Sequence, residues 1–130
     1  MYFDQLGDER GNLVVVEGEK DIPFKIERIF YMYGSEEDVI RGQHANRHSE
    51  FILINLVGTC KVLADDGVTQ EIIKLDEPHK GVYLNKMVWK DMYEFSPDSI
   101  LLVLSSMKYD ATEYIRDYKE FIEELAKEKV

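Results

Sequence analysis

Short hydrophobic runs, several of them alternating with polar residues, fill most of the chain, and this pattern predicts strands. Between Leu13 and about Ser106, six segments are rich in Val, Ile, Tyr and Phe: LVVVEG, FKIERIFYMYG, EFILINLVGTCKVLADDG, TQEIIKL, GVYLNKMVWKDMYEFS and SILLVLSS. Each ends near Gly, Asp-Gly, Pro or Ser, which favour turns. The pair Asp66–Gly67 is typical of a hairpin turn. Strands at this spacing, with no helical pattern between them, predict an all-β sandwich or barrel.

The last part of the chain has a different period. From Asp110 the sequence reads DATEYIRDYKEFIEELAKEKV, in which apolar residues recur at steps of three and four. This spacing predicts one amphipathic helix at about 110–128 with a polar outer face. A terminal helix more often covers a sheet or a subunit interface than carries chemistry. The length of 130 residues suits one domain spanning 1–130.

Charge and composition exclude some functions. The formal net charge of −10 argues against broad binding to DNA or RNA, which needs a basic face. It leaves room for one small anionic ligand held by a few arginines. The longest apolar runs, FILI and ILLVL, are too short to cross a bilayer, and MYFDQLGDER has no features of a secretory signal. The single cysteine, Cys60, permits no internal disulfide, and we expect a soluble cytoplasmic protein.

The stretch RGQHANRHSEFILINLVG carries the candidate chemistry. Strand alternation places His44, Asn46 and His48 on one face, where they form either a polar strand entrance or a ligand site. The pattern Gly42-x-His44-x-Asn46-xxx-Glu50, followed by Gly58, resembles the first motif of the cupin superfamily.

In metal-binding cupins the first motif supplies two histidines and a glutamate, and the second motif supplies one more histidine. The matching second stretch here is NKMVWKDMYE, in which Lys90 takes the histidine position. Asn46 and Lys90 are poor ligands, because a protonated lysine has no lone pair and repels a cation. We therefore predict a site without metal or other cofactor.

A closer resemblance covers nearly the whole chain. The segments DERGNLVVVEG, IPFKIERIFYMYG, RGQHANRHSEFILINLVGTCKV, PHKGVYLNKMVWKDMYEFS, LLVLSS and YDATEYIRDYKEF, together with the Asp-Asp-Gly turn, resemble the small cupins that act as 3,4-ketoisomerases on dTDP-4-keto-6-deoxyhexoses. The resemblance implies a cupin β-barrel or jelly roll, a homodimer, a dTDP-linked keto sugar as substrate and no metal. It also implies a role in deoxysugar biosynthesis for surface polysaccharides.

The family pattern at the opening stretch is commonly Arg-Gly-x-His-Ala-His. Arg41, Gly42, His44 and Ala45 match it, and Asn46 departs from it. At the second motif, where family members carry His or Arg, this chain has Lys90.

The proposed reaction needs a base, a proton donor and a group that stabilises an enediolate. His44 is the predicted base, because a histidine is largely neutral at pH 7. Asn46 can hydrogen-bond a sugar oxygen, and Lys90 can stabilise the enediolate. The second proton comes from Lys90 or from Tyr31, which matches the family's active-site tyrosine but could also simply pack.

Three further residues are predicted to bind the substrate. Arg41 suits bidentate contact with phosphate or a sugar hydroxyl. Tyr33 shares a strand face with Tyr31, and Arg10 lies where related cupins place a basic residue near the ligand, although a surface arginine in a turn is an equal reading.

Other functions remain open on the sequence alone. A cupin that binds a nucleotide sugar without catalysis is one, since Asn46 and Lys90 both depart from the commoner family residues. An epimerase is another, because it shares the first proton removal. A metal-dependent dioxygenase ranks last, because its ligand set is incomplete.

Overall fold

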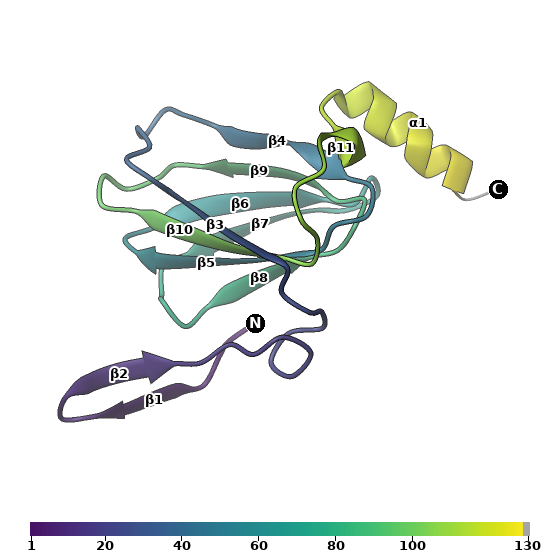
Figure 1. Cartoon of the computed structure of the whole chain (residues 1–130). Helices are drawn as coiled ribbons and strands as arrows, with labels where there is room; N and C mark the ends of the chain where they lie inside the picture. The colour runs from purple at the N-terminus through teal and green to yellow at the C-terminus, as the bar shows by residue number, and fades with distance from the viewer. Residues whose placement is uncertain (129–130) are drawn as a thin grey trace.

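A computed structural model describes residues 1–128 of the chain. Two antiparallel sheets face each other, and a hairpin and a helix lie outside them at opposite ends (Figure 1). The four-stranded sheet has the order β3 (Arg28–Tyr33), β10 (Ile100–Ser105), β5 (Phe51–Val57) and β8 (Gly81–Leu84). The five-stranded sheet has the order β11 (Tyr114–Ile115), β4 (Arg41–Asn46), β9 (Trp89–Tyr93), β6 (Cys60–Asp65) and β7 (Gln70–Leu75).

The main core lies between the two sheets. Its buried residues come from both of them: Phe51, Leu53, Cys60, Val62, Leu75, Val82, Leu84, Met92, Phe95, Leu101 and Val103. The central strand β5 is apolar on both faces, because Ile52 and Ile54 pack outward against Phe3, Ile22 and Phe24 of the N-terminal segment. This double burial explains why FILI reads as a continuous apolar run and not as an alternating one.

The predicted all-β fold with a C-terminal helix is confirmed. The turn at Asp66–Gly67 joins β6 to β7, which pair antiparallel from Asp65↔Gln70 to Cys60↔Leu75. Gly67 has a positive φ of 91°, which glycine adopts without the strain that other residues meet.

The C-terminal helix is shorter than predicted. Helix α1 spans Tyr118–Glu128, and residues 110–117 do not belong to it. A 3-10 turn, η1 (Ala111–Glu113), leads into the short strand β11 (Tyr114–Ile115), which pairs with Ala45 and Asn46 of β4. The apolar spacing of residues 110–117 fits a helix, but pairing with the edge of β4 and burial of Ile115 override it.

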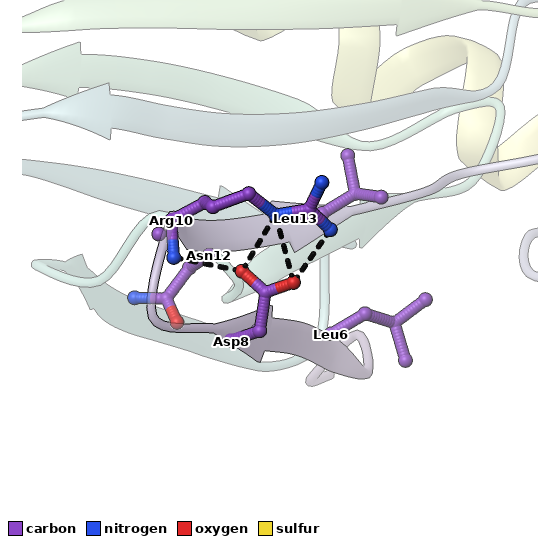
Figure 2. A pocket seen from close by; sticks show the side chains of 7 residues that line it. Leu6, Asp8, Arg10, Asn12 and Leu13 are labelled. Carbon is purple, nitrogen blue, oxygen red and sulfur yellow. Dashed lines mark hydrogen bonds and ion pairs between the residues drawn. The ribbon is translucent and has the colours of Figure 1, made fainter.

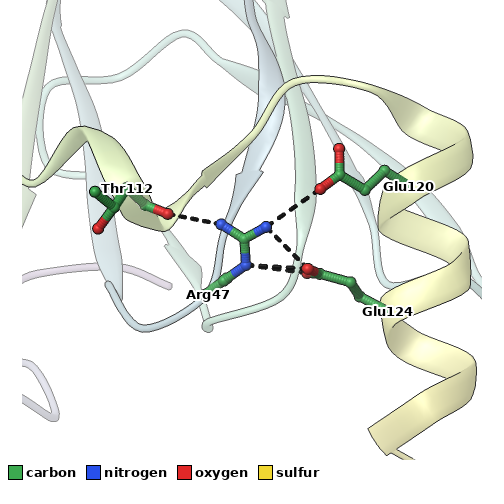
Figure 3. Close-up of polar contacts among 4 residues, drawn as sticks. All are labelled: Arg47, Thr112, Glu120 and Glu124. Atoms are coloured by element: carbon green, nitrogen blue, oxygen red, sulfur yellow. Dashed lines mark hydrogen bonds and ion pairs between the residues drawn. The ribbon is translucent and has the colours of Figure 1, made fainter.

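Helix α1 packs at one end of the five-stranded sheet (Figure 1). Phe121 is fully buried, and its ring centroid lies 5.9 Å from that of Trp89 on β9. Figure 3 shows Arg47, which follows β4, donating hydrogen bonds to Glu120 and Glu124 of the helix and to the Thr112 carbonyl. Within residues 1–128 no helix combines the length and the apolar character that crossing a membrane requires.

The strands β1 (Gln5–Asp8) and β2 (Gly11–Val14) form a separate hairpin. It projects away from the two sheets (Figure 1), and its side chains are largely exposed. Figure 2 shows the turn of this hairpin, where Arg10 folds back onto Asp8 with a separation of 2.6 Å between Nη2 and Oδ2.

Candidate functional site

A cavity of about 130 Å³ lies between the two sheets, at the side of β3 in one sheet and of β4 and β11 in the other. Its walls are largely apolar and include Phe30, Met32, Phe51, Leu53, Met92 and Val103. Four groups with other chemistry line it as well: Arg41, His44, Lys90 and Tyr114. An apolar cavity with a few polar groups directed into it is the usual form of a small-molecule site.

A bulge in β4 sets the direction of His44. The register of β4 on β9 shifts between Gly42 and His44, and both Gly42 and Gln43 have positive φ, at 84° and 55°. A Cβ at Gly42 would lie 2.9 Å from the Lys90 carbonyl oxygen, so glycine is required by space as well as by φ. Beyond the bulge, His44 pairs directly with Lys90 across the two strands.

His44 is held as a neutral base. Its Nδ1 lies 3.0 Å from the Gly42 carbonyl oxygen, which can only accept, so Nδ1 carries the proton and Nε2 keeps its lone pair. Burial, the charge of Lys90 and, more weakly, that of Arg116 lower the pKa of His44 to about 4. The imidazole is therefore unprotonated at neutral pH, as a general base must be.

Lys90 is a buried amine in the same cavity. It is 3% exposed, and its Nζ donates a hydrogen bond of 2.9 Å to the Asn46 Oδ1. The same atom lies 4.7 Å from the ring centroid of Phe51, a favourable position for a cation. Burial lowers the pKa of Lys90 to about 7, although the charge of Glu113 opposes the shift.

These contacts do not fit a metal ion of the cupin type. The second ligand position holds Asn46, whose amide oxygen is already bonded to Lys90. The Lys90 ammonium occupies the place of the fourth ligand, where it would repel a cation. The buried Lys90–Asn46 pair replaces the metal-binding half of the motif.

The structure places some predicted residues elsewhere. In β3 the even positions Phe30 and Met32 line the cavity, so Tyr31 and Tyr33 point to the opposite face. These two side chains are 59% and 73% exposed and stack on each other with ring centroids 6.3 Å apart. The predicted role of Tyr31 as proton donor in the cavity of its own chain is therefore wrong. Arg10, in the projecting hairpin, also lies outside the residues that line this cavity.

Residues 109–116 contribute side chains that the sequence reasoning missed. Tyr114 lines the cavity, and its ring centroid lies 4.8 Å from that of His44. The Arg116 guanidinium lies 4.9 Å from the Tyr114 ring, and the ring of Tyr109 packs beside it at 5.8 Å. Arg28 lies over Phe30 and Tyr109 at 5.0 and 5.5 Å. Most of these residues lie in the segment YDATEYIRDYKEF, which resembles the family. Its apolar spacing predicted a helix, so the sequence did not indicate that its side chains reach the cavity.

Among the described residues, the arginines near the cavity form no ion pair with an acidic side chain. Arg10 and Arg47 pair with carboxylates, whereas the ion pairs found within residues 1–128 do not involve Arg28, Arg41 or Arg116. Arg28 also has two buried guanidinium nitrogens, Nε and Nη2, with no hydrogen-bond partner in the described structure. Arg41 lines the cavity, and Arg28 and Arg116 lie over rings of the Tyr109–Tyr114 pair, so these guanidinium groups are suited to an anion in a chain with a net charge of −10.

Comparison with known proteins shows the family of the chain. The family model described as FdtA, WxcM-like, C-terminal matches residues 1–126. The chain belongs to the FdtA family. It is 42% identical over 125 residues to a TDP-4-oxo-6-deoxy-alpha-D-glucose-3,4-oxoisomerase from Aneurinibacillus thermoaerophilus, covering 96% of this chain and 90% of that protein.

Two solved structures support the same assignment. WlaRA, a TDP-fucose-3,4-ketoisomerase from Campylobacter jejuni, is 49% identical, with a TM-score of 0.90 over 95% of this chain and 91% of that chain. A variant of QdtA, a 3,4-ketoisomerase from Thermoanaerobacterium thermosaccharolyticum, is 36% identical, with a TM-score of 0.93 over 97% and 91% of the two chains. Its structure was solved with TDP-4-keto-6-deoxyglucose. The predicted resemblance of this FdtA-family chain to 3,4-ketoisomerases is confirmed.

Proposed function

We propose that the protein moves the keto group of a TDP-linked 4-keto-6-deoxyhexose from C4 to C3. The observation that carries this proposal is that His44 and Lys90 are direct partners across β4 and β9 and line one small apolar cavity. A neutral base beside a buried amine supplies the two groups that enolisation of a keto sugar requires. The relatives' 3,4-ketoisomerase activity supports the same reaction.

In the first half-reaction, the Nε2 of His44 removes the proton from C3, which the adjacent C4 carbonyl makes acidic. The electron pair of the C3–H bond forms the C3=C4 double bond, and the carbonyl pair moves onto O4. The Lys90 ammonium stabilises the resulting enediolate, because a charge in an apolar cavity acts with little screening.

In the second half-reaction, Lys90 delivers a proton to C4, since the amine lies in the cavity whereas Tyr31 does not. The O3 hydroxyl loses its proton as the C3 carbonyl forms, and O4 gains one to become a hydroxyl. The proton left on His44 and the one missing from Lys90 balance through solvent. A donor with a pKa of about 7 is well matched to proton transfer near neutral pH.

The diphosphate of the substrate binds at the positive region formed by Arg28, Arg41 and Arg116. Arg41 lines the cavity, and Arg116 lies over Tyr114, which also lines it. Guanidinium groups without acidic partners are free to make bidentate contacts with phosphate oxygens. Asn46 is buried and does not line the cavity, so it acts on the sugar site through the hydrogen bond that its Oδ1 accepts from Lys90.

A homodimer accounts for the exposed apolar surfaces. The hairpin carries exposed Leu6 and Leu13, and the outer face of the edge strand β3 carries Ile29, Tyr31 and Tyr33. We place the hairpin of one copy against this face of the other, which buries both surfaces. In this arrangement Arg10 of one copy contacts the ligand in the cavity of the other, which would be the substrate-binding role predicted for Arg10. Light scattering on the wild type tests the dimer, and a monomeric mass would refute it.

The decisive test is proton NMR in deuterated water with dTDP-4-keto-6-deoxyglucose. We expect loss of the C3 proton signal together with growth of a 3-keto product. No exchange over hours would leave a binding protein without this activity, and exchange at C5 would indicate an epimerase.

The variant His44→Asn tests the base. We expect its kcat to fall by about 10²–10⁴-fold, the usual contribution of a positioned general base, while TDP affinity measured by calorimetry stays nearly unchanged. His48→Asn is the matched control and is expected to keep the wild-type kcat, since His48 is exposed and does not line the cavity. A His44→Asn enzyme with full activity would refute the assignment.

A further inference from the structure

A buried carboxylate belongs to the residue that precedes Tyr114, which lines the cavity. Glu113, at the end of η1, is 1% exposed and accepts hydrogen bonds from the Ser49 hydroxyl, the Ser49 backbone N–H at 2.8 Å and the His48 backbone N–H at 3.1 Å. Burial acts to raise the pKa of Glu113, but these hydrogen bonds lower it overall. Glu113 is therefore an anion at neutral pH, and the mechanism proposed above does not use it.

Asn46 bonds to Lys90, and the backbone next to Asn46 pairs with the segment that carries Glu113, because the Arg47 N–H donates to the Glu113 carbonyl at 2.9 Å. The next residue, Tyr114, pairs with Asn46 across β11 and β4. Because an ammonium can only donate, Lys90 fixes the Asn46 amide with Oδ1 toward the amine and Nδ2 away from it. The Nδ2 makes no hydrogen bond within residues 1–128, yet the Asn46 side chain lies near enough to Glu113 to lower the pKa of that carboxylate.

The other titratable side chains that line the cavity with Lys90, apart from the phenol of Tyr114, are Arg41 and His44, and neither is acidic. His44 and Arg41 come from β4, Arg116 follows β11, and the Phe51 ring faces the amine from β5. Glu113 is the acidic residue whose charge raises the pKa of both Lys90 and His44. A buried ammonium with one hydrogen bond needs such a partner to remain charged.

We propose that Glu113 is a positioning residue: its buried carboxylate, next in sequence to the partner strand of Asn46, supplies the negative charge that keeps Lys90 protonated in the cavity. The proposal rests on the catalytic role proposed for Lys90. Glu113 does not touch the substrate. It acts by keeping the proton on the group that stabilises the enediolate and protonates C4.

The pH dependence of kcat separates this role from a purely structural one. Activity needs neutral His44, so it rises with pH through the pKa of His44, and it needs charged Lys90, so it falls with pH through the pKa of Lys90. Removing the charge of Glu113 lowers both pKa values, so both limbs of the profile move to lower pH. A basic limb that moves down by one pH unit lowers the rate on its alkaline side about tenfold.

The test variant is Glu113→Gln, which keeps the shape of the side chain and removes its charge. We expect a basic limb at lower pH, a reduced kcat at pH 8, and an unchanged KM and TDP affinity. Ser49→Ala is the matched control, because it removes a hydrogen bond to Glu113 and leaves the carboxylate. It should lower the melting temperature with little movement of the limb. A Glu113→Gln enzyme with reduced stability and a wild-type pH profile would overturn the proposal.

Two further measurements keep the test independent of folding and turnover. If Glu113→Gln does not fold, Glu113→Asp is the second variant, because its shorter side chain draws the carboxylate back. We expect the basic limb of the pH profile to move to lower pH by a smaller amount, and a limb that does not move overturns the proposal. NMR titration of ¹³C-labelled lysines follows the ionisation of Lys90 without substrate. A lower Lys90 pKa in the Glu113 variant supports the positioning role even if the protein shows no isomerase activity, and an equal pKa refutes it.

Discussion

Replacing Lys90 by methionine should make stability nearly independent of pH between pH 7 and 8.5. Burial lowers the pKa of Lys90 from 10.5 to about 7. Each pKa unit corresponds to about 1.4 kcal/mol, so the folded state is destabilised by roughly 4 kcal/mol at neutral pH through this one group. Methionine has a similar volume and no proton to bind, so the variant Lys90→Met removes this cost.

The sign of the effect follows from proton binding. Between pH 7 and 10.5 an unfolded lysine holds its proton, whereas Lys90 in the folded protein releases it. The unfolded state therefore binds more protons, and the free energy of unfolding of the wild type rises with pH across this window. The penalty is full below pH 7 and disappears only when the unfolded lysine also deprotonates.

Urea denaturation followed by circular dichroism measures the effect. Between pH 7 and pH 8.5 the wild type should gain about 1.6 kcal/mol more than Lys90→Met, which is the slope of about 1.4 kcal/mol per pH unit reduced by partial titration of Lys90 at pH 7. The range stops at pH 8.5 because of Cys60, whose pKa burial raises from 9.0 to about 12. Above pH 8.5 this thiol ionises in the unfolded state before it does so in the folded state, which lowers the free energy of unfolding.

The pH dependence is a cleaner measure than stability at a single pH. Removing the lysine also leaves the Asn46 Oδ1 without its donor, which costs about 1–3 kcal/mol at every pH. Lys86→Met, a change at an exposed lysine on the preceding loop, is the control and should follow the wild type. Parallel pH curves for the wild type and Lys90→Met would refute the picture of a buried, strained amine.

Three shorter predictions concern the rest of the fold. Phe121→Ala should lower the free energy of unfolding by about 3–5 kcal/mol in urea denaturation, because Phe121 is fully buried against Trp89, and a loss below 1 kcal/mol would show that α1 adds little stability. Arg47→Ala should cost about 1 kcal/mol by the same assay, because its ion pair with Glu124 is partly exposed, and a larger loss would contradict this. Cys60 should react with a thiol reagent only after unfolding, because burial raises its pKa to about 12, and rapid labelling of the native protein would contradict its burial.

The sequence predicted the sheets better than it predicted which face of a strand meets the cavity. The motif placed His44, Asn46 and Lys90 in one site, and the pairing of β4 with β9 brings them together. Tyr31 was assigned to the cavity because it matched a family tyrosine. In β3 the residues on both faces are apolar or aromatic, so alternation shows that Tyr31 and Tyr33 share a face but not which face is inside.

Glu113 and Tyr114 were missed for a different physical reason. Both lie in a segment whose apolar spacing fits a helix, and a strand of two residues is too short to produce a period of its own. What fixes β11 is pairing with Ala45 and Asn46, together with hydrogen bonds from Ser49 and His48 to Glu113 across 64 and 65 residues of sequence.

Such long-range contacts carry no local signal, yet they decide the chemistry of the site. The same segment sets Tyr114 beside His44 and buries the Glu113 carboxylate, whose charge acts on Lys90. A lysine in the second-motif position suggests from sequence a charged surface group or a simple electrostatic clamp. Buried next to one amide, it becomes an amine whose pKa is lowered by burial, a shift that the charge of Glu113, 23 positions farther along the chain, opposes.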